Sequence, residues 1–234
     1  MCIQLKNQNE KPVTTDKELL EILPYIHTQA LKAVGKHPDF PKIASKEHYT
    51  LVVNEVRKLF INAGISLIEV PSFDHEYEVV SEIQKTEAQV YVDEIVREGI
   101  VSLVGGRVLT EVLEILDSSR QHRAKIVAFE ELFGYVANMR TLADKEQYAL
   151  LVGLKLAIAS LEFWRNELND RRSPYREFVV KEGQNRRRLP WADIIGGVVN
   201  CIGCGVGGTV AGCIGCASIS SGLSSSWFGN QTKE

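Results

Sequence analysis

Four cysteines near the C-terminus form the pattern in this chain with the clearest chemical meaning. Residues 201–204 and residues 213–216 both read Cys-Ile-Gly-Cys, and they supply Cys201, Cys204, Cys213 and Cys216. Four thiolates at C-x2-C-x8-C-x2-C spacing can hold one zinc ion in a tetrahedral site. The spacer between the two pairs, however, is small and apolar and lacks the cations that favour a four-thiolate site. We therefore expect no cofactor, with one zinc ion as the alternative.

The same thiols offer redox chemistry. A thioredoxin-like role needs Cys-x-x-Cys at the start of a helix in a βαβ unit, and the rest of the chain shows no such pattern. If the segment is exported, the four thiols can form two disulfides, with three possible pairings. A zinc- or redox-responsive four-cysteine module on a helical scaffold is therefore one functional hypothesis.

The cysteines lie in a long segment without charge. Residues 194–232 contain no charged side chain, and ten of the chain's 18 glycines fall between Gly196 and Gly229. On a helix, one row of side chains is β-branched and the other rows are almost all small. Two glycine pairs have the i, i+4 spacing at which transmembrane helices approach each other closely, namely Gly203 with Gly207 and Gly208 with Gly212. We expect these four glycines to mediate helix association, including self-association.

This segment also has the length of a membrane span. About 20 apolar residues cross a bilayer, and residues 194–214 supply 21 without a charge. Trp191 is placed to lie at the membrane interface, and Arg186, Arg187 and Arg188 form a basic flank that favours anionic headgroups. So many glycines disfavour a helix in water, whereas lipid forces the backbone to satisfy its own hydrogen bonds. The sequence predicts that residues 191–234 are a tail, helical in a membrane or otherwise disordered.

The preceding residues predict an all-α body. Apolar residues at 3–4 spacing indicate helices over about 15–34, 46–63, 74–98, 100–116, 121–140 and 144–168, and strand signals are poor. Pro24 is expected to kink or split the first helix, and Gly105-Gly106 to weaken the fourth. The predicted organisation is a flexible arm (1–14), a multi-helix bundle (15–170), a basic linker (171–190) and the tail (191–234).

Other motifs give no sign of catalysis or nucleic-acid binding. No Walker loop, nucleophile elbow or His-Glu-x-x-His motif occurs, and the five histidines are scattered, so we expect them to be solvated or to cap helices. The formal net charge of −3 does not favour nucleic acid as a partner. We expect a protein that is not an enzyme.

The tail resembles known membrane-active peptides. Over residues 196–222 it is similar to Gly-rich bacteriocin peptides, whose helices associate through Gly-x-x-x-Gly faces. A soluble body followed by a Cys/Gly-rich apolar peptide also resembles halocin-type precursors, in which one chain joins an immunity-like segment to a C-terminal peptide. The resemblance implies a toxin-like precursor that acts on membrane lipid.

Three hypotheses follow. The first is a membrane-directed, bacteriocin-like precursor with a cytoplasmic body and a membrane-associated or exported tail, because the N-terminus lacks an apolar signal region. The second is the zinc- or redox-responsive module. The third is a helical adaptor with an inert tail, for which truncation after Arg188 leaves function intact.

Overall fold

The structure is all-α over the residues that it describes. This computed structural model describes residues 16–36, 46–65, 72–176, 188–203 and 219, and within them the regular structure is helical, with no strand. The helices are α1 (Asp16–Gly35), α2 (Lys46–Asn62), α3 (Phe73–Lys85), α4 (Ala88–Arg97), α5 (Leu103–Asp117), α6 (His122–Ala137), α7 (Asp144–Asn169) and α9 (Arg188–Gly203). The predicted fold class of the body is confirmed.

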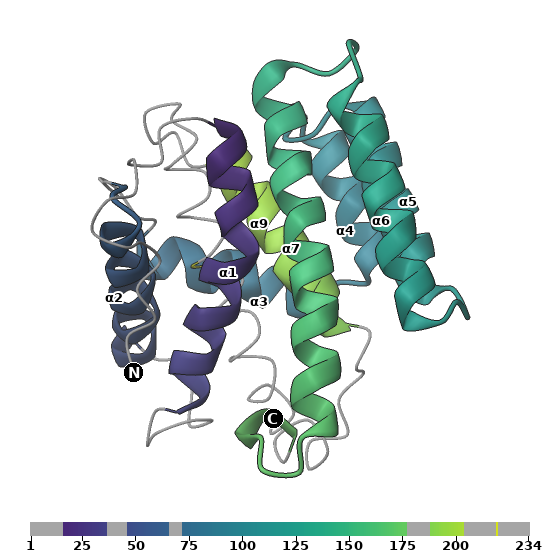
Figure 1. Cartoon of the computed structure of the whole chain (residues 1–234). Helices are drawn as coiled ribbons and strands as arrows, with labels where there is room; N and C mark the ends of the chain where they lie inside the picture. The colour runs from purple at the N-terminus through teal and green to yellow at the C-terminus, as the bar shows by residue number, and fades with distance from the viewer. Residues whose placement is uncertain (1–15, 37–45, 66–71, 177–187, 204–218, 220–234) are drawn as a thin grey trace.

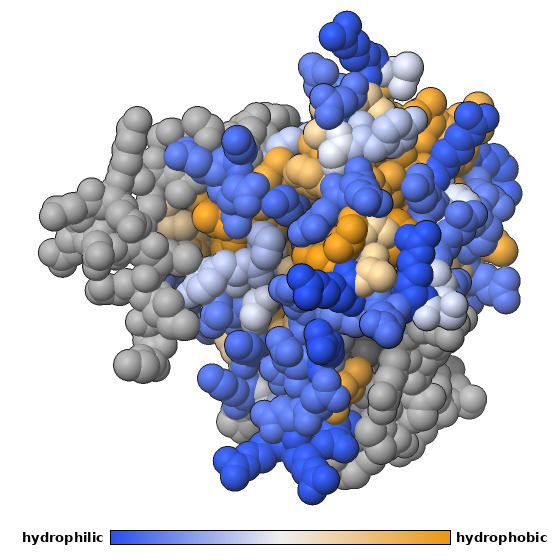
Figure 2. All heavy atoms as spheres, turned by 45° about the vertical axis from the view of Figure 1, so that its right-hand side comes forward, coloured by the Kyte–Doolittle hydropathy of each residue, from blue (hydrophilic) through white to orange (hydrophobic). Residues whose placement is uncertain are grey.

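Helix α7 is the centre of the bundle. It contacts α1, α5, α6 and α9, and α9 lies behind α1 and α7 in Figure 1. A helix that is apolar on most of its faces must be buried on most of them. Helix α7 fits this rule, with buried residues along its whole length: Ala149, Leu150, Val152, Gly153, Leu154, Leu156, Ala157, Ala159, Ser160, Phe163 and Trp164. Hydrophilic side chains predominate on the face shown in Figure 2, as expected when the apolar ones face inward.

Two hydrophobic clusters meet at α7. The larger one combines residues of α3, α4, α5, α6, α7 and α9. The smaller one joins α1 and α2 to Val80 of α3, to Val152 and Leu156 of α7, and to Ile219. Residues on opposite faces of α7 therefore hold the two halves of the bundle together.

Two local predictions differ from the structure. Helix α1 runs without interruption through Pro24, so the predicted split does not occur. The helix predicted over 74–98 is instead two helices, because Thr86 and Glu87 have extended backbone angles. The break has a tertiary reason: α3 packs against α9, whereas α4 packs against α5.

Glycines end two helices and permit close packing of another. Gly64 and Gly99 follow α2 and α4 with φ of 72° and 73°, a left-handed conformation that glycine adopts at little cost. Gly105 and Gly106 lie inside α5, where a Cβ atom would collide with the Glu146 carboxylate or the Val96 side chain. The glycine pair thus lets α5 approach its neighbours, and it does not interrupt the helix.

Three consecutive residues at the start of α7 form hydrogen bonds with backbone groups at the ends of three other helices. Lys145 Nζ donates to Ile202 O at the end of α9 (2.8 Å). The Glu146 carboxylate accepts from Ser102 N before α5 (2.8 Å), and Gln147 Nε2 donates to two carbonyls, Val136 O and Met139 O, at the end of α6. Helix ends leave backbone groups without intrahelical partners, and the charges of Lys145 and Glu146 suit the dipoles that they face. The start of α7 therefore fixes the end of α9.

Candidate functional site

The apolar C-terminal segment enters the core of the body. The side chains of α9 are almost completely buried at Trp191, Asp193, Ile194, Ile195, Val198, Val199 and Cys201. Ile219 is also fully buried, among residues of α1 and α2. The body therefore includes the first part of the predicted tail, whereas the sequence placed the whole of residues 191–234 outside it.

A glycine on α7 sets the distance between α7 and α9. A Cβ atom built on Gly153 would lie 2.5 Å from Val198 Cγ2 and 3.5 Å from Ile194 Cγ2. Ile194 and Val198 begin the β-branched row that the sequence indicated, and this row packs where α7 has no side chain. The close approach thus depends on a glycine of the partner helix. The predicted small-residue contact at Gly203 cannot be compared with it, because Gly207, Gly208 and Gly212 lie outside the described residues.

A buried carboxylate makes the polar contact between the same two helices. Asp193 Oδ2 accepts from Ser160 Oγ (2.5 Å) and from Trp164 Nε1 (3.4 Å), both on α7. His27 of α1 lies on the other side, with Nε2 at 3.9 Å from Asp193 Oδ2. We call Gly153, Ser160 and Trp164 of α7, together with His27 of α1, the α9 docking site.

The histidine in this site is uncharged. His27 is fully buried, and burial lowers its pKa from 6.5 to about 3, because an imidazolium loses its hydration there. This finding corrects the expectation that all five histidines are solvated or cap helices. An exposed histidine would titrate near neutral pH, whereas this one gains a proton in the closed bundle only in strong acid.

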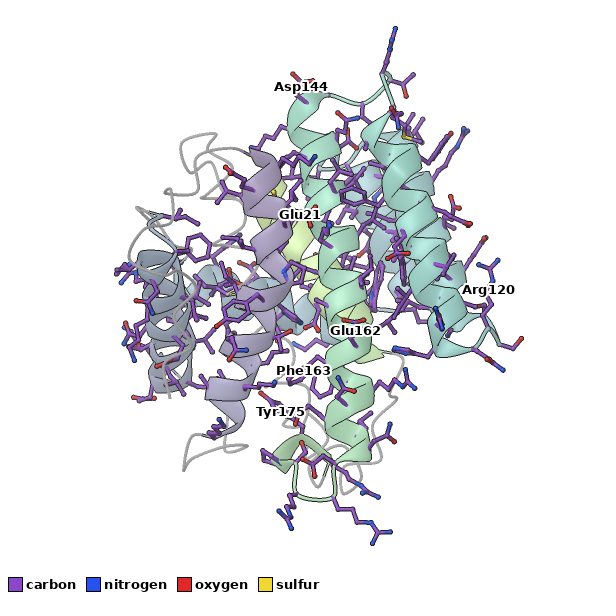
Figure 3. The ribbon with its side chains drawn as sticks, in the orientation of Figure 1. Glu21, Arg120, Asp144, Glu162, Phe163 and Tyr175 are labelled. Carbon is purple, nitrogen blue, oxygen red and sulfur yellow. The ribbon has the colours of Figure 1, made fainter. Side chains whose placement is uncertain are left out.

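Aromatic rings pack beside the docking site, toward the C-terminal end of α7. The rings of Phe163, Trp164 and Tyr175 meet edge to face, with centroids 5.1–5.3 Å apart, and Figure 3 shows Phe163 and Tyr175 on the side of α7 that faces α1. The Tyr175 hydroxyl donates to Leu31 O (2.6 Å), and burial raises the pKa of this phenol well above 10.0. Tyr175 lies within the predicted basic linker, so the body continues past Asp170.

We expect Tyr175→Phe to lower the free energy of unfolding by about 1–2 kcal/mol, because a buried hydroxyl–carbonyl bond is lost while the ring remains. Urea unfolding followed by circular dichroism measures this change. Tyr135→Phe is the matched control, since Tyr135 is 62% exposed, and it should leave stability unchanged. Equal effects of the two substitutions would contradict the role given to Tyr175.

The remaining predicted residues lie either in the core or outside the described residues. Trp191, predicted at a membrane interface, is 3% exposed in the core, and its Nε1 has no hydrogen-bond partner among the described residues. Cys201 is buried and disulfide-bonded, so its sulfur is not available as a thiolate ligand for zinc in this state. Arg188 and Gly203 are the first and last residues of α9. The others lie outside the described residues: Arg186, Arg187, Cys204, Cys213 and Cys216, with the three glycines named above.

Ser160 and His27 of the docking site, together with Asp193 of α9, have the residue types of a hydrolase triad, but their arrangement is different. In a triad, histidine lies between serine and the carboxylate and accepts the serine proton. Here Asp193 lies between Ser160 and His27, and all three side chains are fully buried. This geometry gives no activated nucleophile and no access for a substrate. What the site does is hold one apolar helix.

Sequence reasoning missed Asp193 and His27. Asp193 is the only acidic residue between Glu182 and the terminal Glu234, and a lone carboxylate beside an uncharged segment is a usable signal. His27 lies one residue after Ile26 in an apolar part of α1, but nothing in the sequence indicates that α9 covers it.

Comparison with known proteins identifies no family for this chain. The chain matches no protein family, no curated protein and no solved structure. Any assignment of function therefore depends on the residues and the geometry of this chain alone.

The described residues were also compared with the requirements of membrane spans and metal sites. Helix α7 alone among the described helices has the length and composition of a span, but 61% of its apolar window is buried, as in the core helix of a soluble bundle. No group of three potential metal ligands occurs in the described part of the chain.

An open cavity of about 540 Å³ lies between α5 and α6, lined by Glu111, Glu114, Ile115, Arg120, Ala128, Glu131, Leu132 and Tyr135.

Proposed function

We propose that this chain is a non-enzymatic, membrane-directed protein, of the bacteriocin-like precursor kind, whose helical body shelters its own apolar C-terminal segment. The observation that carries the proposal is the burial of α9 in the α9 docking site, next to an uncharged continuation of the chain. The body is cytoplasmic in this proposal, and the segment acts on membrane lipid once it is released.

Burial of α9 supports the shelter. Glycine-rich apolar sequence is a poor helix in water, and exposed apolar helices associate nonspecifically. Helix α9 is nevertheless helical here, because α7 covers its β-branched row and Lys145 satisfies its last turn. Ile219 gives a second attachment to the body beyond α9. A body that holds the segment at two places keeps it away from water and from membranes.

The polar contact supports a reversible attachment. An ionised carboxylate is very costly in hydrocarbon, so a permanently inserted helix would place Asp193 at the interface or neutralise it. In the body the same group is held by two donors of α7. Asp193 therefore favours the docked state, and the rest of the segment favours lipid. Four small-residue positions, Gly203, Gly207, Gly208 and Gly212, then provide the surface for association between released helices.

Two features bear on the other hypotheses. The disulfide at Cys201 favours an oxidised form of the cysteine segment over a zinc-bound one. The adaptor hypothesis treats the tail as inert, but truncation after Arg188 would remove a core helix. We therefore expect that truncation to expose the apolar face of α7, which argues against an inert tail.

The proposal is tested by comparing the intact protein with its isolated segment. A peptide of residues 188–234 should partition into anionic vesicles and gain helicity, whereas the intact protein at neutral pH should remain unbound. Vesicle flotation and circular dichroism measure the two properties. The control peptide carries Ile202→Lys and Val206→Lys, which lie at the middle of the predicted span over residues 194–214. Each lysine placed near the bilayer centre costs about 2.5–3.5 kcal/mol, so the control should lose membrane binding.

Two outcomes would count against the proposal. If the unmodified peptide neither floats nor gains helicity, lipid is not its target. If the intact protein binds vesicles as strongly as the peptide, the body does not shelter the segment.

A further inference from the structure

His27 lies where three helices meet, and it is shielded from solvent there. It belongs to α1, and its ring is 6.4 Å from the Phe163 ring of α7 in an edge-to-face arrangement. Asp193 faces it from α9 at 3.9 Å, and α7 adds Ser160 and Trp164 around the same carboxylate. Beyond Phe163 lies Tyr175, whose hydroxyl is committed to Leu31 O. Helix α2 presents apolar side chains to α1, among them Val52, Val56 and Phe60.

We propose that His27 is an acid-sensitive element of the α9 docking site, and that its protonation lets α9 leave α7. The geometric basis is that a fully buried imidazole lies against the carboxylate that anchors α9. If α9 moves away, the side of His27 that faces Asp193 becomes open to water. Undocking then exchanges a buried neutral ring for a hydrated ring that is free to accept a proton.

The direction of the pH effect follows from the two states. Burial holds the pKa of His27 at about 3 in the closed bundle, while an exposed imidazole has its ordinary value of 6.5. Between these values the open state binds one more proton than the closed state, so docking weakens as the pH falls. Above pH 6.5 both states are neutral and docking is strongest. One proton changes the opening equilibrium by up to about tenfold per pH unit.

Asp193 does not cancel this effect. Its Oδ2 atom already accepts from the Ser160 hydroxyl, and it lies 3.9 Å from His27 Nε2, beyond hydrogen-bond distance. An imidazolium at this position would therefore gain attraction to Asp193 but no hydrogen bond to it. The loss of hydration outweighs that attraction, so the docked state keeps His27 neutral.

This inference deepens the proposed function. It rests on that function only for its biological meaning, which is that protonation of His27 releases the segment near an acidic surface or in an acidic compartment. The acid sensitivity of docking is a property of the body, and it can be measured without any membrane. The two claims are therefore tested by separate readouts on the same full-length protein.

The experiment compares full-length wild type with His27→Gln, His27→Leu and the control His75→Gln, in which an exposed histidine is removed. Hydrogen exchange of α9, corrected for the intrinsic exchange rate at each pH, is followed from pH 7.5 to 4.5. The opening constant of α9 should rise about a hundredfold in wild type and in His75→Gln over this range. In both His27 variants it should change little with pH. Because the readout is the slope with pH, a variant that is less stable at every pH still gives an answer.

Asp193→Asn identifies the titrating group. If His27 is the trigger, the pH slope persists in Asp193→Asn. An unchanged slope in both His27 variants, or a slope lost in Asp193→Asn but kept without His27, would overturn the inference. Flotation with anionic vesicles at pH 5 is the second readout. If α9 opens in acid and the protein still does not bind vesicles, the trigger stands and the proposed membrane function fails.

Discussion

Gly153→Ala should destabilise the bundle, although alanine is the better helix former. The new methyl group would occupy the space filled by the Val198 side chain, 2.5 Å from Cγ2. Overpacking of this kind costs about 1–3 kcal/mol, against a gain of about 1 kcal/mol from helix propensity. Valine has a stiff, β-branched side chain and cannot rotate away freely. We therefore expect a net loss of stability and a selective loss of hydrogen-exchange protection in α9.

The matched control is a glycine in a similar helical position with nothing next to it. Gly134 lies inside α6, and a Cβ atom built there meets no atom within 4 Å. Gly134→Ala should therefore raise stability by up to about 1 kcal/mol, through propensity alone. Urea unfolding of both variants gives the comparison. Stabilisation of the same size at both positions would mean that α9 does not pack on Gly153.

The largest loss is expected at Asp193. Asp193→Ala removes the acceptor that two buried donors share, and it leaves the Ser160 hydroxyl and the Trp164 N–H in an apolar interior. Each buried donor that is left unsatisfied costs about 1–3 kcal/mol, and this substitution leaves two such donors. We expect a loss of about 3 kcal/mol or more, measured by urea unfolding. Asp193→Asn should lose less, because its amide oxygen still accepts.

An exposed aspartate provides the control, and a double variant tests the contact itself. Asp93 lies on the surface of α4, where its carboxylate accepts from Gln89 Nε2. Asp93→Ala should change stability by no more than about 0.5 kcal/mol. Ser160→Ala combined with Asp193→Ala should cost at least about 0.5 kcal/mol less than the sum of the single losses. Additive losses would show that Ser160 and Asp193 do not act as a pair.

Most helices of the body could be predicted because their signals are local. Apolar periodicity located α2, α6 and α7 within a few residues. The failures were all decided by neighbours. The pattern over 74–98 is continuous, but α3 and α4 pack against different helices. Gly105 and Gly106 look like helix breakers in sequence, but in the bundle they are points of close approach to Val96 and Glu146.

The candidate site could be predicted only in part. The sequence identified the uncharged segment and its β-branched row, and Ile194 and Val198 of that row are the residues that pack on α7. It did not indicate the partner surface, since Gly153, Ser160 and His27 are separated from α9 by tens to more than a hundred residues. Nor did it distinguish an apolar helix that inserts into a membrane from one that is buried in a protein core, because both environments select the same side chains.

Sequence alone therefore determined the helical class and most helix positions, together with an uncharged, glycine- and cysteine-rich C-terminal segment. These properties follow from periodicity and composition, which each stretch of chain carries by itself. Only the tertiary structure decided that α9 lies inside the bundle, that Asp193 meets Ser160 and Trp164, and that His27 is buried and neutral. Each of these depends on contacts between distant segments, and burial, which sets both the packing and the pKa of His27, exists only once those segments meet.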